Sequence, residues 1–483
     1  MKMNLTLYLI AMLVLGCAVS SCTDEEYTVS RSDVLVFAND TVKMDTVFCN
    51  IPSSAKSFWV FNKTSKTIRV SSVRLDRGNQ SGFRVNVDGI YLGQETGFQT
   101  SEVEIMGGDS IRVYVELTAP TNDLGAPKKI EDDLCFTLES GVTQKVNLNA
   151  FAWKALILND VNVETDTVWS GEVPIVVYGA LKVDSLATLT LGAGTTVYFR
   201  DEAKLDVYGR LLCKGEPGNE VVLRGYRLDN MFDYLPYDRV SGQWGGVHFH
   251  ESSYENELDY TDLHSAYTGI EVDSCDTIRP TLVMNSATVH NCQGYGIVAY
   301  RSRLELKNCQ ITNTLKDCLH VDGGNVTLNN CTLAQFYPYD SNRGMALNFT
   351  TNKGDLTFLC RNTLVTGYAD DVVNGTLADP ERKFDIGFED CILRTPQFTV
   401  DKNAEQTDTV RYSNVLFESP EDTVTTGKKH FKNIDTDNLI YNFQLDSISP
   451  AVDKGNPLTA EPVDRQGLRR DDTPDIGAFE RTN

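Results

Sequence analysis

The sequence predicts an all-β protein whose main body is a solenoid of parallel strands, preceded by a small antiparallel β-sandwich. Short apolar runs recur every 22 residues, at 282–289, 304–311 and 326–333. An interval of this length is typical of one coil of a right-handed parallel β-helix, in which each coil adds strands to long parallel sheets. Looser copies of the run occur at 258–263, 355–364 and 385–393.

A second column of apolar residues follows the same interval and indicates which side chains face inward. One position holds Val247, Ile270, Ile297, Leu319 and Met345, and the position two residues further on holds Phe249, Val272, Ala299, Val321 and Leu347. Side chains alternate between the faces of a strand, so the residues between and after these should point outward. A large sandwich would not give one interval in two independent columns, which favours the β-helix.

The same alignment assigns several of the twelve cysteines. Cys309, Cys331 and Cys391 fall at one inward position, where we expect reduced thiols that act as small apolar fillers. Asn308 and Asn330 directly precede two of them, and we expect stacked amides that bond one another at a corner of the coil. There is no Cys-x-x-Cys pair or close Cys/His cluster, so no metal site is predicted.

The region 33–153 alternates apolar and polar residues in short runs separated by turn residues, as in the Ile-Arg-Val-Tyr-Val run at 111–115. Several such strands at close spacing predict an antiparallel β-sandwich. Cys49 and Cys135 either pair across this sandwich or are two small buried apolar side chains. No residue pattern in this region indicates catalysis, so we expect a spacer.

The first 22 residues predict export and a lipid anchor. Lys2 precedes an apolar stretch at 5–18, which is too short for a stable transmembrane span. The Val-Ser-Ser-Cys segment that follows resembles a bacterial lipobox, which implies a signal peptide at 1–21 and acylation of Cys22, with Cys17 as the weaker alternative. The remaining possibility is a cleaved signal peptide with no lipid.

The residues after Cys22 predict where the exported protein is anchored. The acidic start of the segment 22–32 resembles the signal that sends Bacteroidetes lipoproteins to the outer face of the outer membrane, so we expect a tether at the cell surface. The formal net charge of the chain is −23, and such a surface repels nucleic acid and anionic lipid headgroups. Membrane attachment through the lipid alone, no nucleic acid partner and a monomer are therefore expected.

Three segments resemble parts of known Bacteroidetes surface proteins. The Gly-Gln-Trp-Gly-Gly-Val stretch at 242–247 is similar to a tryptophan turn of their β-helix proteins, and the region 33–153 is similar to the immunoglobulin-like domains that follow their lipid anchors. The segments 449–455 and 464–480 resemble the closing part of many pectate-lyase-like β-helix proteins.

These resemblances imply a β-helix at 154–435 and a C-terminal closing segment at 436–483. We expect the closing segment to cap the last coil, because the sheets would otherwise end in an open edge.

Outward positions of the second column predict a field of polar side chains on one sheet. The first outward position holds His248, Glu271, Val298, His320 and Ala346, and the next holds His250, Asp273, Tyr300, Asp322 and Asn348. Adjacent coils are about 4.8 Å apart, so neighbouring side chains should be within reach of one another.

Two loops rich in aromatic residues are expected to flank this field. One contains Tyr234, Tyr237 and Trp244, and the other contains Tyr337 and Tyr339. Aromatic rings stack on sugar faces, while carboxylates and imidazoles bond sugar hydroxyls. The pattern favours a surface that binds a polysaccharide or other glycan, against the alternative of ordinary solvated residues.

Two enzyme chemistries remain as alternatives. Asp273 and Asp322 lie two coils, roughly 9.6 Å, apart and would serve as the carboxylates of an inverting glycosidase, with His320 as another possible base. A pectate-lyase-like reaction needs Ca²⁺ and a basic residue, and only Arg301 and Arg303 lie near. We favour glycan capture without a cofactor, leaving Ca²⁺ open, over an adhesin or scaffold.

Overall fold

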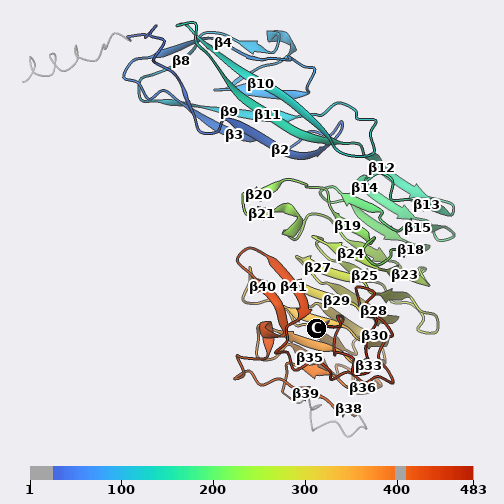
Figure 1. Ribbon diagram of the computed structural model, residues 1–483. Coiled ribbons are helices and arrows are strands. Elements are labelled where there is room, and N and C mark those ends of the chain that lie inside the picture. The colour runs from blue at the N-terminus through green and yellow to red at the C-terminus, as the bar shows by residue number, and fades with distance from the viewer. Residues whose placement is uncertain (1–25, 397–408, 482–483) are drawn as a thin grey trace, which may run out of the picture. The chain divides into compact units, whose positions relative to one another are not determined.

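The computed structural model describes residues 26–396 and 409–481, which form strands and three short 3-10 helices (Figure 1). The predicted signal peptide and Cys22 lie outside the described residues. Within those residues there is no helix with the length and apolarity needed to cross a bilayer. The chain divides into two compact units, residues 1–154 and 155–483.

The N-terminal unit contains two β-sheets that share one apolar core. One sheet has the order β1 (Val36–Phe37), β3 (Lys56–Phe61), β9 (Ser110–Leu117), β5 (Phe83–Val87) and β6 (Ile90–Tyr91). The other has the order β2 (Thr41–Phe48), β11 (Thr143–Trp153), β10 (Lys128–Leu138), β4 (Ile68–Leu75) and β7 (Gln99–Thr100), and β8 (Val103–Ile105) also pairs with β4. Helix η1 (Gln94–Thr96) follows β6.

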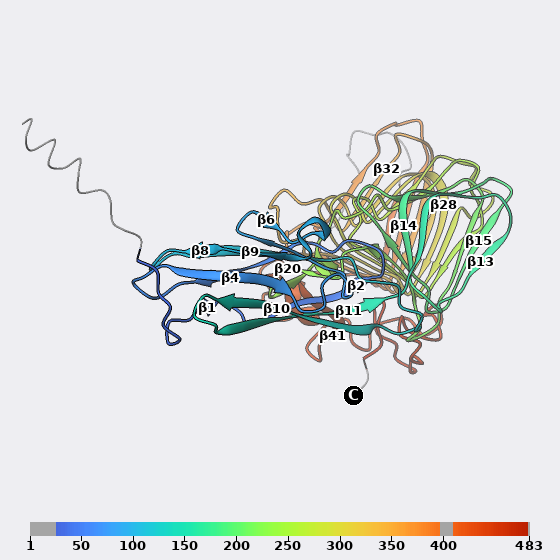
Figure 2. The ribbon, with the colours of Figure 1, turned by 90° about the horizontal axis from the view of Figure 1, so that it is seen from above.

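Pairing in this unit is antiparallel except between β2 and β11. Figure 2 shows β4 and β9 side by side, along the length of the unit. Cys49 and Cys135 are both buried and free, so they are small apolar side chains of the sandwich and do not form a disulfide.

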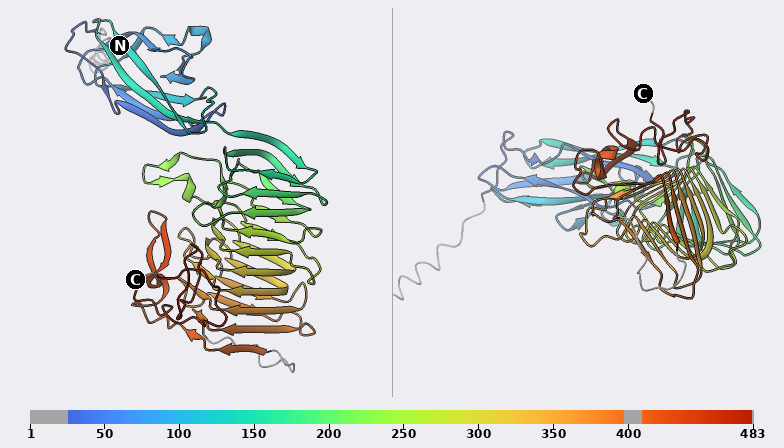
Figure 3. Two further views of the ribbon diagram at one scale, coloured as in Figure 1. Left: turned by 45° about the vertical axis from the view of Figure 1, so that its right-hand side comes forward. Right: turned by 90° about the horizontal axis from the view of Figure 1, so that it is seen from below.

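The second unit is a right-handed parallel β-helix, as the sequence predicted. Its coils contribute strands to three parallel sheets, which we name the β24, β25 and β26 sheets; Figure 3 shows the coils stacked on one another. The long strands β12 (Leu156–Val163) and β14 (Ile175–Val183) begin in the β24 sheet and continue into the β25 sheet.

The strands of each sheet follow in chain order. The β24 sheet continues with β16 (Thr196–Phe199), β19 (Val221–Gly225), β24 (Thr261–His264), β27 (Thr288–Cys292), β29 (Gln310–Thr314), β31 (Thr332–Gln335), β34 (Leu364–Gly367), β37 (Ile392–Leu393) and β39 (Leu416–Phe417). The β25 sheet continues with β17 (Lys204–Val207), β22 (Val247–Phe249), β25 (Ile270–Val272), the first parts of β28 (Ile297–Lys307) and β30 (Leu319–Asn329), β32 (Leu347–Thr350) and β35 (Val373–Thr376).

The β26 sheet completes each coil. It comprises β13 (Thr167–Trp169), β15 (Thr188–Gly192), β18 (Arg210–Lys214), β23 (Asn256–Asp259), β26 (Leu282–Asn285), the second parts of β28 and β30, β33 (Leu356–Arg361), β36 (Phe384–Glu389) and β38 (Thr409–Ser413). Two hairpins stand outside the coils, β20–β21 (Asn230–Phe232, Leu235–Pro236) and β40–β41 (Phe431–Asp435, Ile440–Leu445), as do the 3-10 helices η2 (Tyr237–Arg239) and η3 (Gly427–His430).

The register between coils confirms the 22-residue interval. Leu282 pairs with Leu304, and Leu304 pairs with Val326. The second column is also confirmed from Val247 to Leu319, but there the prediction for the next coil was wrong by two residues, because Leu347 and not Met345 pairs with Leu319. The loop before β32 is longer than the repeat allows.

From β23 onward, each corner between the β26 and β24 sheets places one non-glycine residue at positive φ. These residues are Tyr260, Ser286, Asn308, Asn330, Asn362, Asp390 and Asn414, with φ from 40° to 56°. Asn adopts this conformation more readily than most residues, which explains the asparagines of the repeat. Their predicted stacking was wrong: the amide of Asn308 donates to Val463 O, and that of Asn330 donates to Asp475 O.

The C-terminal segment therefore lies along the side of the solenoid, and Figure 3 shows it beside the coils. Arg465 reaches Thr288 and Glu220, and the backbone of Ala478 donates to Thr332 Oγ1. Apolar residues of β31 and β34 pack against Phe443 and Phe479. The expectation that this segment caps the last coil was wrong, because it covers a sheet face and its corner.

Burial of the thiols gives a test of the fold. The ten cysteines of the described residues are buried and free, and burial raises the pKa of Cys213, Cys292 and Cys318 to about 12. Since the thiolate is the reactive form, a chain that begins at Thr23 should show almost no reaction with a disulfide reagent at pH 8. In guanidinium all ten thiols should react. Several fast-reacting thiols in the native protein would contradict the packing described here.

Candidate functional site

The structure brings together the residues of the predicted polar field that lie on the coils of β22 and β25. His248 in β22 and His250 directly after it point outward, and His248 Nε2 lies 3.1 Å from Asp273 Oδ1. Asp206, which pairs with His248 from β17, joins them. One donor atom each from His248, Glu271 and Asp273 lies within 4.8 Å of the others. This group, which we call the β22 cluster, spans three coils.

The rest of the predicted field forms a separate group or is buried. His320 Nδ1 lies 2.9 Å from Asp317 Oδ2, which also accepts a hydrogen bond from Asn348. Asn348 pairs with His320 and therefore belongs to the first outward position, not to the second as predicted. Val298 and Ala346 are buried.

The pair of carboxylates proposed for a glycosidase does not face a common opening. Tyr300, which is half-buried, pairs with Asp322, so Asp273 and Asp322 are two coils apart as expected. Asp322, however, is only 5% exposed and accepts a hydrogen bond from Lys353 N. The loop after β32 closes over it, and a substrate cannot reach its carboxylate in this conformation.

The predicted aromatic rim was wrong at two positions. Trp244 is 1% exposed, stacks on Phe199 at 4.2 Å and donates from Nε1 to His264 O, so it belongs to the interior. Tyr337 is also buried, with its hydroxyl 3.2 Å from Ser241 Oγ.

The other three tyrosines of the two loops are accessible. Tyr234 and Tyr339 are exposed, while Tyr237 is half-buried under the guanidinium of Arg227. Tyr339 lines a pocket of about 590 Å³ with Tyr368, Arg343 and two residues between β40 and β41. The aromatic loops therefore stand beside hairpin β40–β41 and not beside the β22 cluster.

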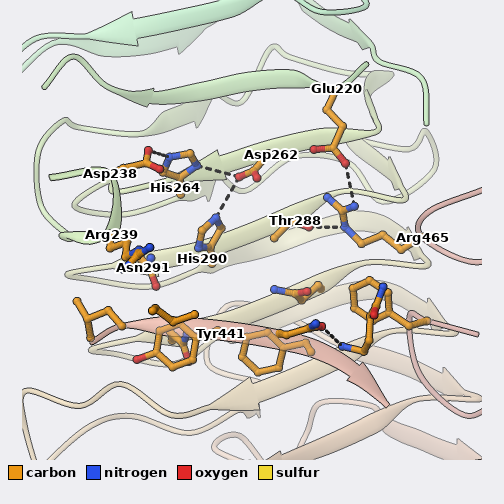
Figure 4. A pocket seen from close by; sticks show the side chains of 18 of the residues that line it. Glu220, Asp238, Arg239, Asp262, His264, Thr288, His290, Asn291, Tyr441 and Arg465 are labelled. Atoms are coloured by element: carbon orange, nitrogen blue, oxygen red, sulfur yellow. Dashed lines mark hydrogen bonds and ion pairs between the residues drawn. The ribbon is translucent and has the colours of Figure 1, made fainter. Parts of the chain in front are cut away.

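A larger set of polar groups surrounds a second pocket, of about 540 Å³, over the β24 sheet. We call it the β24 pocket. Strands β24, β27 and β29 form its floor, η2 and β41 form two walls, and the C-terminal segment around Arg465 forms another. Figure 4 shows the side chains of this pocket, with Tyr441 on the hairpin side. Its volume lies in the usual range for small-molecule sites.

His264 is held between two carboxylates in this pocket. Its Nδ1 lies 2.9 Å from Asp262 Oδ1, and its Nε2 lies 2.9 Å from Asp238 Oδ1 (Figure 4). Burial alone would lower the pKa of His264, but the two carboxylates outweigh it and raise the pKa to about 9. His264 is therefore an imidazolium at neutral pH.

The pKa values of the two carboxylates are shifted downward. Burial raises the pKa of Asp238, but hydrogen bonding to His264 and the charge of Arg224 outweigh it and lower the pKa to about 2. The charges of His290 and His264 likewise hold the pKa of Asp262 well below its usual value despite burial. Both carboxylates are ionised at neutral pH and can accept hydrogen bonds, but neither can donate a proton.

Two buried polar groups of the β24 pocket have no hydrogen-bond partner in the described structure. Both amide atoms of Asn313, which is 1% exposed, are unpaired, and so is the hydroxyl of Tyr441. An unpaired buried polar group costs about 1–3 kcal/mol. These atoms are closed to solvent in this conformation, so a ligand bonds them only when the side chains that cover them shift.

Sequence reasoning missed most of this pocket. The alternation rule, applied to the strands at 261–264 and 288–292, would have placed Asp262, His264 and His290 on one face. The positions of Asp238, Tyr441 and Arg465 cannot be read from strand alternation, because these residues come from helix η2, hairpin β40–β41 and the C-terminal segment, which lie outside the coils.

Comparisons with known proteins support the fold of the solenoid. The family model described as a right-handed β-helix region matches residues 237–358. None of the curated proteins matches the chain.

Similar solved structures include a Porphyromonas gingivalis W83 protein of unknown function (10% identity, TM-score 0.18, covering 28% of this chain and half of that one). The Vibrio cholerae VesB protease is 12% identical with a TM-score of 0.17, and the match covers 25% of this chain and 32% of that one. The PapD-like domain 7 of human CEP192 is 10% identical with a TM-score of 0.17, and the match covers 28% of this chain and 93% of that one. TM-scores this low carry no argument about function.

The imidazolium of His264 makes stability depend on pH. Its folded pKa of about 9 lies above its unfolded value, so its stabilisation is complete below about pH 6.5 and is lost as the pH rises through about 9. The free energy of unfolding of the parent protein relative to His264→Gln should fall by on the order of 3 kcal/mol between these limits. Urea unfolding of the β-helix at both pH values measures this difference. Parallel pH profiles for the two proteins would show that His264 is not held in this way.

Proposed function

We propose that this protein is a carbohydrate-binding protein that holds a sugar unit in the β24 pocket. The observation that carries the proposal is a pocket of suitable size with amide, hydroxyl, imidazole and carboxylate groups in its lining, where the Asn313 amide and the Tyr441 hydroxyl have no partner. Sugar hydroxyls both donate and accept hydrogen bonds, so one ring can satisfy amide, hydroxyl and carboxylate partners together.

The charges of the pocket favour a neutral sugar. Among the described lining residues there are three carboxylates and three cationic side chains, which are Glu220, Asp238, Asp262, Arg239, Arg465 and His264. Glu220 is paired with Arg465 at 2.9 Å, and His264 is paired with both aspartates. The three negative and three positive charges of the lining balance one another, which favours a neutral ligand.

The neighbouring aromatic pocket offers room for further sugar units. Tyr339 and Tyr368 are exposed there, and both pockets are bounded by hairpin β40–β41. Aromatic faces stack on sugar rings. A chain of several units would extend from the β24 pocket onto these two tyrosines.

Binding is favoured over hydrolysis. A glycosidase needs one carboxylic acid that is protonated at working pH, whereas Asp238 and Asp262 both have lowered pKa values. With the lipobox resemblance at Cys22, the protein would capture glycans at the cell surface without cleaving them.

The test is a glycan array followed by calorimetry with the best ligand. Asn313 has φ of 57°, so Asn313→Gly removes the amide without straining the backbone. Tyr441→Phe removes only the hydroxyl. Each variant should weaken binding about tenfold, which is the effect of one lost hydrogen bond.

The matched control is Asn414→Gly, an exposed asparagine with φ of 52° at a corner of a later coil. Its affinity should equal that of the parent protein. Full affinity in both pocket variants, or no ligand among neutral glycans, would contradict the proposal. Release of shorter sugars during the assay would show an enzyme instead.

A further inference from the structure

We propose that the β22 cluster is a binding site for a divalent transition-metal ion such as Zn²⁺, with Asp206, His248 and His250 as ligands. This inference is independent of the β24 pocket, which lies on another sheet. It also departs from the expectation, drawn from the sequence, that the chain has no metal site.

The solenoid positions the three ligands on two neighbouring strands. His248 and His250 are separated by one residue in and just after β22, so both side chains leave the same face of the β25 sheet. Asp206 pairs directly with His248 from the preceding coil. The side chain of Asp206 is only 5% exposed, while those of the histidines are 22% and 17% exposed. The ligands therefore form a partly shielded set that an ion can enter from solvent.

The distances between donor atoms suit one small ion. Asp206 Oδ1 lies 3.0 Å from His250 Nε2 and 3.8 Å from His248 Nδ1, and one donor atom from each of the three residues lies within 4.8 Å of the others. Ligands about 2.0–2.2 Å from a tetrahedral zinc ion are roughly 3.3–3.5 Å apart. Three protein ligands leave a position open for water or another ligand.

Asp273 supplies the outer partner that metal-bound histidines need. The remaining nitrogen of each ring faces this one carboxylate, with His248 Nε2 at 3.1 Å from Oδ1 and His250 Nδ1 at 3.5 Å from Oδ2. A histidine that binds a metal almost always donates its other N–H to such a group, which fixes its orientation. Tyr208 also stacks on the His250 ring at 3.9 Å and restricts its rotation.

The local charge also calls for a cation. Asp206, Glu271 and Asp273 give three negative charges in the coils on either side of β22, and Lys204 gives one positive charge, with its ammonium 3.0 Å from Asp206 Oδ1. This side chain is half-exposed. The ammonium is paired with the same Asp206 oxygen that would bind the metal, so the ion must displace it, and Lys204 acts as a competitor.

The other cluster of this composition is a poorer metal site. Asp262, His264 and His290 also place donor atoms within 4.8 Å. The His264 side chain, however, is only 7% exposed, against 22% and 17% for His248 and His250, and each of its nitrogens lies 2.9 Å from a carboxylate, so an ion reaches it less easily. Asp262 therefore provides a matched control for a His/Asp cluster on the same solenoid.

The experiment titrates the metal-free protein with Zn²⁺ in competition with a chromophoric chelator, and records the visible spectrum with Co²⁺. One ion per chain should bind, and Co²⁺ should give the absorption of a low-coordinate nitrogen and oxygen site. Asp206→Asn and His250→Gln should abolish binding, and Asp273→Asn should weaken it about 10–100-fold. Lys204→Met should tighten it, because the competing ammonium is removed.

The variant Asp262→Asn should leave the Zn²⁺ affinity unchanged. Thermal unfolding of each variant without metal shows whether it is folded, and Lys204→Met keeps all the proposed ligands. The proposal is overturned if the parent protein does not bind Zn²⁺, if Asp206→Asn retains full affinity, or if Asp262→Asn alone abolishes binding.

Discussion

Register between successive coils is the constraint on which the rest of the β-helix depends. Leu282, Leu304 and Val326 stack because each coil repeats the backbone of the one before it, and the parallel ladders can form only in that register. The interior is filled by side chains from all three sheets, in one continuous core. A slip by one residue would turn this core outward, so apolar burial and backbone hydrogen bonding specify the same alignment.

The same register produces the polar clusters. Coils are spaced by about 4.8 Å, so outward residues in equivalent positions are always neighbours, and a His or Asp in each of two coils makes a contact. This is how Asp206 meets His248, and how Asp262 meets His290. The two clusters differ because the β22 cluster has Lys204 beside it, whereas the Asp262, His264 and His290 cluster of the β24 pocket is enclosed by helix η2 and hairpin β40–β41.

Enclosure of the β24 pocket rests on contacts outside the repeat. Hairpin β40–β41 packs through Phe431 and Phe443 on Phe336. Directly before the hairpin, the buried His430 places its Nε2 2.7 Å from Oε1 of the buried Glu418. Arg394 contacts the same carboxylate from the end of β37. Removing one partner of such a buried pair leaves an uncompensated charge, so this anchor keeps the wall of the pocket in place.

The sequence by itself determined the coil interval, the inward columns and the outward histidines, because burial and backbone pairing repeat with every coil. It failed where the repeat is interrupted. The long loop before β32 shifted Asn348 by two residues, Trp244 turned into the interior, and Asn308 and Asn330 bonded the C-terminal segment. Only the tertiary structure decided which outward residues became enclosed, because Asp238, Tyr441 and Arg465 are brought to β24 by segments without periodicity.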